Sequence, residues 1–125
     1  TMVMRTDQQV VIEQGGAVGH NVHSYPIFNP VAPTFSRPGK PGQPVKLQRF
    51  KLKEPVPMQV KCDIHGWMNA YWLVIDHPYA ATTDGDGRFV IKKVPAGEHS
   101  LTIWHERIGY IEKSFNIRVQ NKNQT

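Results

Sequence analysis

The sequence has little cysteine and no long hydrophobic run, and both absences limit what the protein can be. Its 125 residues include a single cysteine, Cys62, so no internal disulfide can staple the fold. No stretch of about eighteen apolar residues occurs, and we therefore expect no membrane-spanning helix of its own. A lone cysteine is most often a small buried hydrophobe, which makes the neighbours of Cys62 the deciding observation.

Charge of one sign is never concentrated either. Lysine and arginine total 15 against 10 acidic residues, a formal net charge of +5, but the basic residues are scattered along the chain. Without a run of about five like charges, the sequence does not resemble a nucleic-acid-binding arm. A diffuse positive surface favours acidic protein partners or an anionic membrane face through electrostatic steering, and it also promotes solubility.

The motifs of common enzymes are missing as well. No serine lies in a nucleophile elbow, and no glycine-rich phosphate loop is present. The Asp-Gly-Asp-Gly run that begins at Asp84 fails as a calcium loop, because the twelfth position counted from Asp84 is Pro95, where that loop needs a glutamate. We interpret this run as a turn, and we expect that the protein is not an enzyme.

Glycine and proline, with 10 residues each, interrupt the chain often and favour many short strands over long helices. Several segments alternate apolar and polar residues, as half-buried strands do. Residues 26–44 are rich in proline and predict an irregular loop, and residues 88–91 are expected to pair back as a hairpin arm after the Asp84 turn. The pattern predicts an all-β protein, an antiparallel sandwich or barrel of the Greek-key type. We expect eight or nine short strands, among them residues 10–12, 20–25, 58–62, 70–75, 88–91, 100–104 and 115–119. Residues 45–53 are expected to form a further strand, with a bulge or a turn onto another face where the alternation slips between Leu47 and Phe50.

Three metal-ligand side chains stand together in the seven residues that begin at Cys62. Cys62, His65 and Met68 supply a thiolate, an imidazole and a thioether from one tight polar loop. Thiolate with thioether selects copper, and imidazole suits copper too. Two histidines and a cysteine with a weak axial methionine form the blue-copper electron-transfer site, so the loop needs a second imidazole from elsewhere in the chain.

His20 and His23 are the upstream candidates for that second imidazole. They are three residues apart, so on a strand they point to opposite faces and only one of them can readily face the site. His77 and His105 each flank an apolar strand and are further candidates for a ligand or for the rim of the site. Trp67 lies inside the loop and is a candidate docking residue for a partner.

These residues resemble the cupredoxin family, of the plastocyanin, pseudoazurin and amicyanin type. The spacing of Cys62, His65 and Met68 is similar to the amicyanin ligand loop, and the Val-Lys before Cys62 is similar to pseudoazurin. The Gly-His-Asn-Val segment around His20 resembles the part of pseudoazurin and plastocyanin that carries the upstream ligand. The resemblance implies that His20 completes the copper site and that Asn21 braces the ligand loop and hydrogen-bonds near the cysteine sulfur.

The resemblance also implies a function. A protein of this family binds one copper ion, cycles it between Cu(I) and Cu(II), and exchanges electrons with a redox partner such as a c-type cytochrome in the periplasm or another extracytoplasmic compartment. The alternative is a structural or docking subunit of a larger exported or membrane redox or photosynthetic complex, with an auxiliary or empty copper site. Copper storage or delivery is a third alternative, and its only support is the additional histidines His23, His77 and His105.

More closely, the chain resembles bacterial cupredoxin-like proteins that carry a carboxypeptidase-regulatory-like, or prealbumin-like, part. This resemblance implies one domain over residues 1–125. Two departures from the family stand out: only nineteen residues precede His20, and Gly66 stands where the family loop often has proline. We therefore expect either that N-terminal strands of the family are missing from this chain or that extra C-terminal hairpins replace them. The expected parts are a copper-site part (10–77), a prealbumin-like β extension (78–119) and a frayed tail (120–125).

Overall fold

The computed structural model describes residues 1–13, 18–31, 34–35, 45–46 and 49–120, and at 34–35 and 45–46 it describes the backbone alone. The regular structure of these residues consists of β-strands, which confirms the all-β prediction. No helix in the described part of the chain is long and apolar enough to cross a membrane. The chain forms two compact units, Thr1–Thr82 and Thr83–Thr125. Most of the predicted frayed tail, residues 121–125, lies outside the described residues.

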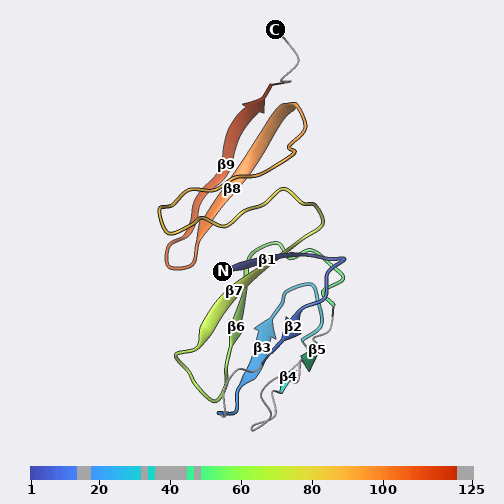
Figure 1. The fold of residues 1–125 in the computed structure, drawn as a ribbon, viewed down its shortest axis with the longest axis vertical. Coiled ribbons are helices and arrows are strands. Elements are labelled where there is room, and N and C mark those ends of the chain that lie inside the picture. The colour runs from blue at the N-terminus through green and yellow to red at the C-terminus, as the bar shows by residue number, and fades with distance from the viewer. Residues whose placement is uncertain (14–17, 32–33, 36–44, 47–48, 121–125) are drawn as a thin grey trace. The chain divides into compact units, whose positions relative to one another are not determined.

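The first unit is built on a five-stranded sheet (Figure 1). Its strands, with those of the small second sheet of this unit, are β1 (Met2–Arg5), β2 (Val11–Ile12), β3 (Asn21–Tyr25), β4 (Thr34–Phe35), β5 (Val45–Lys46), β6 (Met58–Lys61) and β7 (Asn69–Ile75). The order in the large sheet is β1-β7-β6-β3-β4, and β2 pairs with β5 in the small one. β1 runs parallel to β7, whereas the other neighbouring strands are antiparallel.

The hydrophobic core lies on one face of β6 and β7, because successive side chains of a strand point to opposite faces. Met58 and Val60 of β6, and Cys62 directly after it, are all buried, as the alternation predicts. Trp72 and Val74 are the buried residues of β7. The core cluster of buried residues consists of Met4, Phe50, Met58, Val60, Trp72 and Val74.

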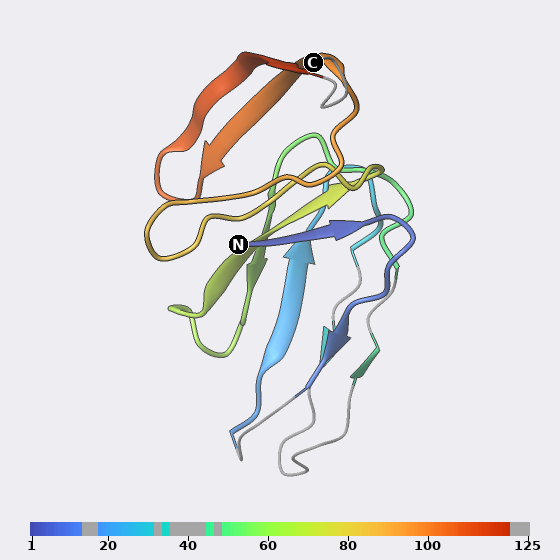
Figure 2. The same ribbon diagram turned by 45° about the horizontal axis from the view of Figure 1, so that its top comes forward.

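The strand β1 is not among the predicted strands. It lies beside β7 (Figure 2) and pairs with it in parallel. Met4 is opposite Val74, and its side chain is in the core at 4% exposed. Its four residues are too few to show a period, and the partner strand lies about seventy residues away in the sequence. The structure therefore supplies an N-terminal strand ahead of His20, at the edge of the large sheet.

A buried carboxylate, Glu54, ties the segment after β3 to the segment before β6. Its oxygens accept hydrogen bonds of 2.8–3.2 Å from three successive backbone N–H groups, those of Ile27, Phe28 and Asn29. The side-chain amide of Asn29 donates a further hydrogen bond at 2.7 Å. Burial raises the pKa of Glu54, but these hydrogen bonds outweigh burial and hold the pKa below its usual value. The carboxylate thus accepts hydrogen bonds from the backbone N–H groups of residues 27–29, which lie outside the strands and have no strand partner.

The second unit is a β-hairpin of β8 (Gly97–His105) and β9 (Gly109–Val119) with the segment that precedes it. Its register places Leu101 opposite Phe115 on one face and Ser100 opposite Asn116 on the other. The hairpin therefore has an apolar and a polar face. The predicted strands 100–104 and 115–119 both lie within it, and each is longer than predicted.

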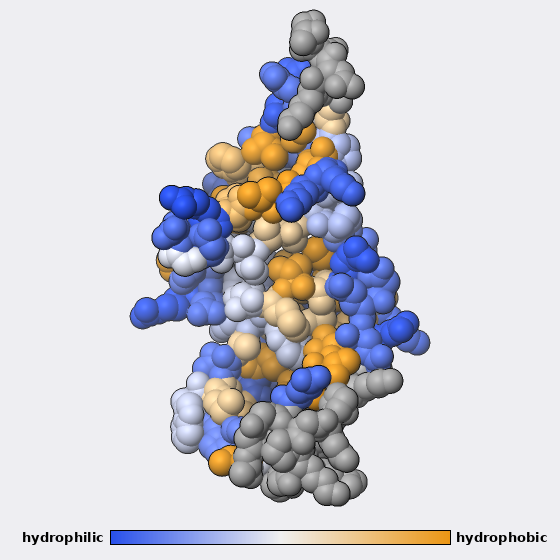
Figure 3. Space-filling view, in the orientation of Figure 1, coloured by the Kyte–Doolittle hydropathy of each residue, from blue (hydrophilic) through white to orange (hydrophobic). Residues whose placement is uncertain are grey.

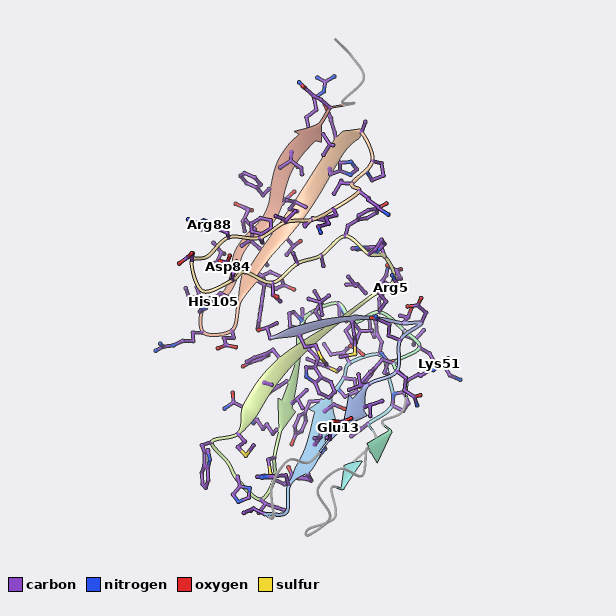
Figure 4. All side chains as sticks on the ribbon, viewed as in Figure 1. Arg5, Glu13, Lys51, Asp84, Arg88 and His105 are labelled. Atoms are coloured by element: carbon purple, nitrogen blue, oxygen red, sulfur yellow. The ribbon has the colours of Figure 1, made fainter. Side chains whose placement is uncertain are left out.

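The prediction of a hairpin arm at residues 88–91 is wrong. The turn itself forms, because the Asp84 carboxylate accepts hydrogen bonds from the N–H groups of Asp86 (3.0 Å) and Arg88 (2.8 Å), and Figure 4 shows Asp84 and Arg88 in this turn. Gly87 supports it with a φ of 79°, a value that favours glycine. Residues 88–91 form no strand, and neither do residues 79–83 before the turn, so no strand ladder continues from the turn on either side. A turn signal alone does not choose which segments pair.

Candidate metal centre

The pairing of β3 with β6 brings His20 and Cys62 together. The antiparallel register places His23 opposite Lys61, so the residues just before β3 meet those just after β6. His20 is the residue before β3 and Cys62 is the residue after β6. Two ligand-type residues that are 42 positions apart in the sequence thus lie at the same end of the sheet.

The loop from Cys62 to Met68 is closed by its own backbone. The N–H of Met68 donates to the carbonyl of His65 at 2.9 Å, and the N–H of Cys62 donates to the carbonyl of Met68 at 3.0 Å. These bonds turn the chain back on itself, so His65 faces Cys62 rather than solvent. Among the described residues, none but the chain neighbours of Gly66 comes within 4 Å of the position that a Cβ would take there, so crowding does not require glycine.

Three donor atoms converge at this end of the sheet. The Nδ1 of His65 lies 3.1 Å from the Nδ1 of His20 and 3.6 Å from the Sγ of Cys62, and the third separation, Sγ to the Nδ1 of His20, is 4.0 Å. Cys62 is 5% exposed and the two histidines are half-buried. Donor atoms on one first-row metal ion lie about 3.3–3.8 Å apart, because metal–nitrogen and metal–sulfur bonds are about 2.1 and 2.3 Å long. The observed separations of 3.1–4.0 Å are within a few tenths of an ångström of this range, so the three side chains form a group that could hold a single ion.

The Cys62 thiol is poised to ionise. Burial raises its pKa, but hydrogen bonds from the Asn21 backbone N–H, the His20 side chain and the backbone and side chain of His65 together lower it from 9.0 to about 6. Thiolate, not thiol, is the metal ligand. At neutral pH a metal ion would therefore meet a ligand that is already mostly deprotonated.

In the metal-free protein we expect the ultraviolet absorbance of the Cys62 thiolate to titrate with a midpoint near pH 6. An unperturbed cysteine titrates at about pH 8.5, and the two imidazoles and the Asn21 N–H account for the difference. The same titration of Cys62→Ser supplies the baseline. A midpoint at the unperturbed value would show that these groups do not stabilise the thiolate.

Asp63 is a site residue that the sequence analysis does not identify. Its backbone N–H donates to the Oδ1 of Asn21 at 2.7 Å, and the Nδ2 of Asn21 donates to its Oδ2 at 2.5 Å. The Nδ1 of His23 lies 3.0 and 3.2 Å from the two carboxylate oxygens. The hydrogen bond from Asn21 lowers the pKa of Asp63, and His23 lowers it further. The sequence could have revealed this contact if the two predicted strands 20–25 and 58–62 had been paired in antiparallel register. With His23 opposite Lys61, the same register places Asn21 opposite Asp63.

The other residues of the ligand loop lie toward solvent. Trp67 is 78% exposed, and its ring centroid lies 5.2 Å from that of His65. Met68, the predicted axial ligand, is 43% exposed, and its backbone closes the loop. The role of its thioether stays a prediction, and so does the docking role of Trp67.

The remaining histidines lie outside the converging group. In the part of the chain that the structure describes, His20, Cys62 and His65 form the group with metal-ligand geometry. His23 bonds to Asp63 instead, whereas His77 and His105 each accept a hydrogen bond of 3.2 Å from a backbone N–H two residues on. Figure 4 shows His105 at the turn of the β8–β9 hairpin, in the second unit.

Comparison of the chain with family models, with curated proteins and with solved structures finds no match.

Proposed function

We propose that this protein is a blue-copper-type electron-transfer protein that holds one copper ion through His20, Cys62, His65 and Met68. The observation that carries the proposal is the convergence of one sulfur and two imidazole nitrogens within 4.0 Å of one another. The lowered pKa of Cys62 supports it, because a thiolate is the ligand that copper requires here. The family resemblance of the loop and of the His20 segment points the same way.

The choice of copper follows from the softness of the donor set. A thiolate and a nearby thioether favour copper over harder ions, and two imidazoles with one thiolate suit both of its oxidation states. A bound copper would accept one electron from a reduced partner and pass it to an oxidised one. The protein would then have to hold the donor atoms in fixed positions and to exclude water from Cys62. The burial of Cys62 excludes water from its sulfur.

Visible absorption of the oxidised protein after addition of copper(II) tests this function. We expect an intense blue band that disappears on reduction, with one copper per chain by elemental analysis. A colourless protein that retains no copper after desalting would overturn the proposal. Zinc(II), which has no redox chemistry, is the matched control for adventitious binding to the same donor atoms.

The exposed ring of Trp67 supports a docking role at the end of the site. It lies against His65, so a partner that covers it also approaches the proposed copper ligand. Aromatic residues are enriched at the centres of protein interfaces. We propose a redox partner such as a c-type cytochrome in an extracytoplasmic compartment.

Trp67→Ala should slow electron exchange with such a partner by about tenfold or more, the size expected when an aromatic anchor is lost. The free energy of unfolding should change by no more than about 0.5 kcal/mol, because the side chain is mostly exposed. Stopped-flow mixing of the copper-loaded protein with a c-type cytochrome measures the rate. An unchanged rate would place the docking surface elsewhere, and Ile64→Ala, at 63% exposed in the same loop, is the matched control.

A docking subunit is the second candidate function, and the hairpin unit favours it. None of the described residues of this unit is buried, and a two-stranded sheet is marginally stable by itself. Hydrophobic side chains gather at the surface of this unit on the face drawn in Figure 3. The exposed large hydrophobic residues of the hairpin unit are Phe89, Val90, Ile103, Ile108, Ile111 and Phe115. Surfaces of this kind mark interaction sites.

This second function predicts stable co-purification with a larger exported or membrane complex and no bound copper. Isolation of the chain from its source under mild conditions, followed by metal analysis of the complex, distinguishes the two functions. A free, blue, monomeric protein would favour electron transfer and contradict a purely structural role.

A further inference from the structure

We propose that Asp63 and His23 are positioning residues of the metal centre: together they hold Asn21 against the ligand loop and so fix the separation of the His20 and Cys62 donor atoms. This inference rests on the proposed function, because it assigns a task at the same site. It concerns two side chains outside the ligand set.

The need for such residues follows from where the sheet ends. The β3–β6 ladder reaches the pair of His23 and Lys61, and β6 ends there. His20 and Cys62 lie beyond this last pair, so the ladder does not hold their donor atoms at a fixed distance. Side chains must continue the connection between the two segments.

Asn21 and Asp63 provide that connection. The backbone N–H of Asp63 donates to the Asn21 side chain, and the Asn21 side chain donates back to the Asp63 carboxylate, at 2.7 and 2.5 Å. The two bonds form a cyclic pair that stands in for a rung of the ladder. Asn21 is 5% exposed, so water competes poorly for its amide. Each partner of this pair is the chain neighbour of a proposed ligand.

His23 restrains the Asp63 carboxylate from its open side. The Asp63 side chain is 52% exposed and would turn into solvent if Asn21 alone held it. His23 is two residues from Asn21 and therefore on the same face of β3, and its Nδ1 lies 3.0 Å from the Oδ2 of Asp63. The Tyr25 ring stacks on His23 with centroids 4.4 Å apart and an interplanar angle of 21°, which fixes the imidazole in turn. The Nζ of Lys61 lies 5.7 Å from the centroid of the Tyr25 ring. Asp63, His23, Tyr25 and Lys61 thus form a row of side chains in successive contact.

Removal of a side chain from this row should weaken copper binding without abolishing it. Loss of hydrogen-bonded partners behind metal ligands typically weakens metal binding by about 10- to 100-fold. We expect Asp63→Ala to weaken copper(II) binding by that factor and to change the copper hyperfine splitting. His23→Ala should act in the same direction with a smaller effect. Because both act through one carboxylate, the double variant should lose less than the sum of the two.

The experiment combines copper affinity by chelator competition, electron paramagnetic resonance of the copper-loaded protein, and amide hydrogen exchange of residue 63 in the metal-free protein. Asp76→Ala is the matched control, because the Asp76 side chain is 49% exposed and pairs with Lys53 at 2.9 Å, away from the ligand loop. Asp63→Asn keeps an acceptor for Asn21 and should recover part of the affinity. Exchange at residue 63 should speed up in Asp63→Ala and stay unchanged in the control.

Parental affinity, hyperfine splitting and amide exchange in Asp63→Ala would overturn the positioning role while leaving the copper site intact. If instead the parent protein shows no thiolate–copper band, the proposed function fails. The exchange measurement on metal-free protein then decides the positioning role by itself: faster exchange at residue 63 supports it, and unchanged exchange overturns it.

Discussion

With Cys62 replaced by serine, the copper(II)-loaded protein is expected to show no intense visible band. The band of a blue-copper site arises from charge transfer between the thiolate sulfur and the metal, and a hydroxyl cannot replace it. Cys62 supplies the thiolate of the converging group, with its Sγ 3.6 and 4.0 Å from the two imidazole nitrogens. Absorption and copper analysis of Cys62→Ser, with circular dichroism to verify folding, measure the effect.

Met68→Leu is the control for this substitution. Leucine has a similar volume but no sulfur, and the axial thioether of such a site is weakly bound. We therefore expect Met68→Leu to stay blue with a shifted reduction potential. A Cys62→Ser protein that stays blue would reject the thiolate–copper assignment, whatever the behaviour of the Met68 variant.

The Glu54→Gln substitution is expected to lower the free energy of unfolding by about 2–4 kcal/mol, since hydrogen bonds to a charged group contribute about 1.5–3 kcal/mol each. Both carboxylate oxygens accept hydrogen bonds from backbone N–H groups. In glutamine an NH₂ group takes the place of one oxygen, so it faces backbone N–H donors and cannot accept from them. Glu54 is 5% exposed, so water does not readily replace the lost acceptor. Denaturant unfolding of the metal-free protein, followed by the fluorescence of the buried Trp72, measures the loss.

The same residue gives the protein an acid-dependent stability. The pKa of Glu54 is lower in the folded chain than its ordinary value of 4.5, so the folded state binds the proton less readily than the unfolded state. Its contribution is fully present above about pH 4.5 and is lost as the pH falls through the lower folded-state pKa. The difference between wild type and Glu54→Gln should therefore shrink on acidification below pH 4.5.

Asp7→Asn is the matched control for the loss of a carboxylate. Asp7 is exposed and pairs with Arg5 at 2.8 Å on the surface, so its removal should leave the free energy of unfolding almost unchanged. Equal effects of the Asp7 and Glu54 substitutions on the free energy of unfolding would show that the buried hydrogen bonds of Glu54 stabilise the fold no more than a surface ion pair does.

Local patterns predict a large part of this structure. The alternation around Met58 and Val60 correctly places both side chains and Cys62 in the core. The density of glycine and proline correctly predicts an all-β chain. The spacing of Cys62 and His65 correctly indicates two side chains that converge, because a tight loop keeps near neighbours in sequence near in space. These features depend on residues within a few positions of one another.

Other features depend on segments that are distant in sequence, and local patterns miss them. The four residues of β1 have no period of their own, and their parallel partner β7 is far along the chain. The expected arm at 88–91 follows a well-formed turn, yet neither it nor the segment before the turn forms a strand. The partners of Glu54 lie 25 to 27 positions away and form no recognisable motif.

The sequence by itself determined the strand class, the core face of β6 and the chemistry of the ligand loop, because periodicity and side-chain chemistry are properties of short segments. The spacing of His20 and His23 left both open, the resemblance pointed to His20, and the tertiary structure shows that His20 joins Cys62 and His65. Only the tertiary structure decided that Asp63 faces Asn21 and His23. These choices follow from the register between β3 and β6. A shift of one residue in that register would turn every side chain of a strand to its other face, and no local pattern encodes which register two distant strands adopt.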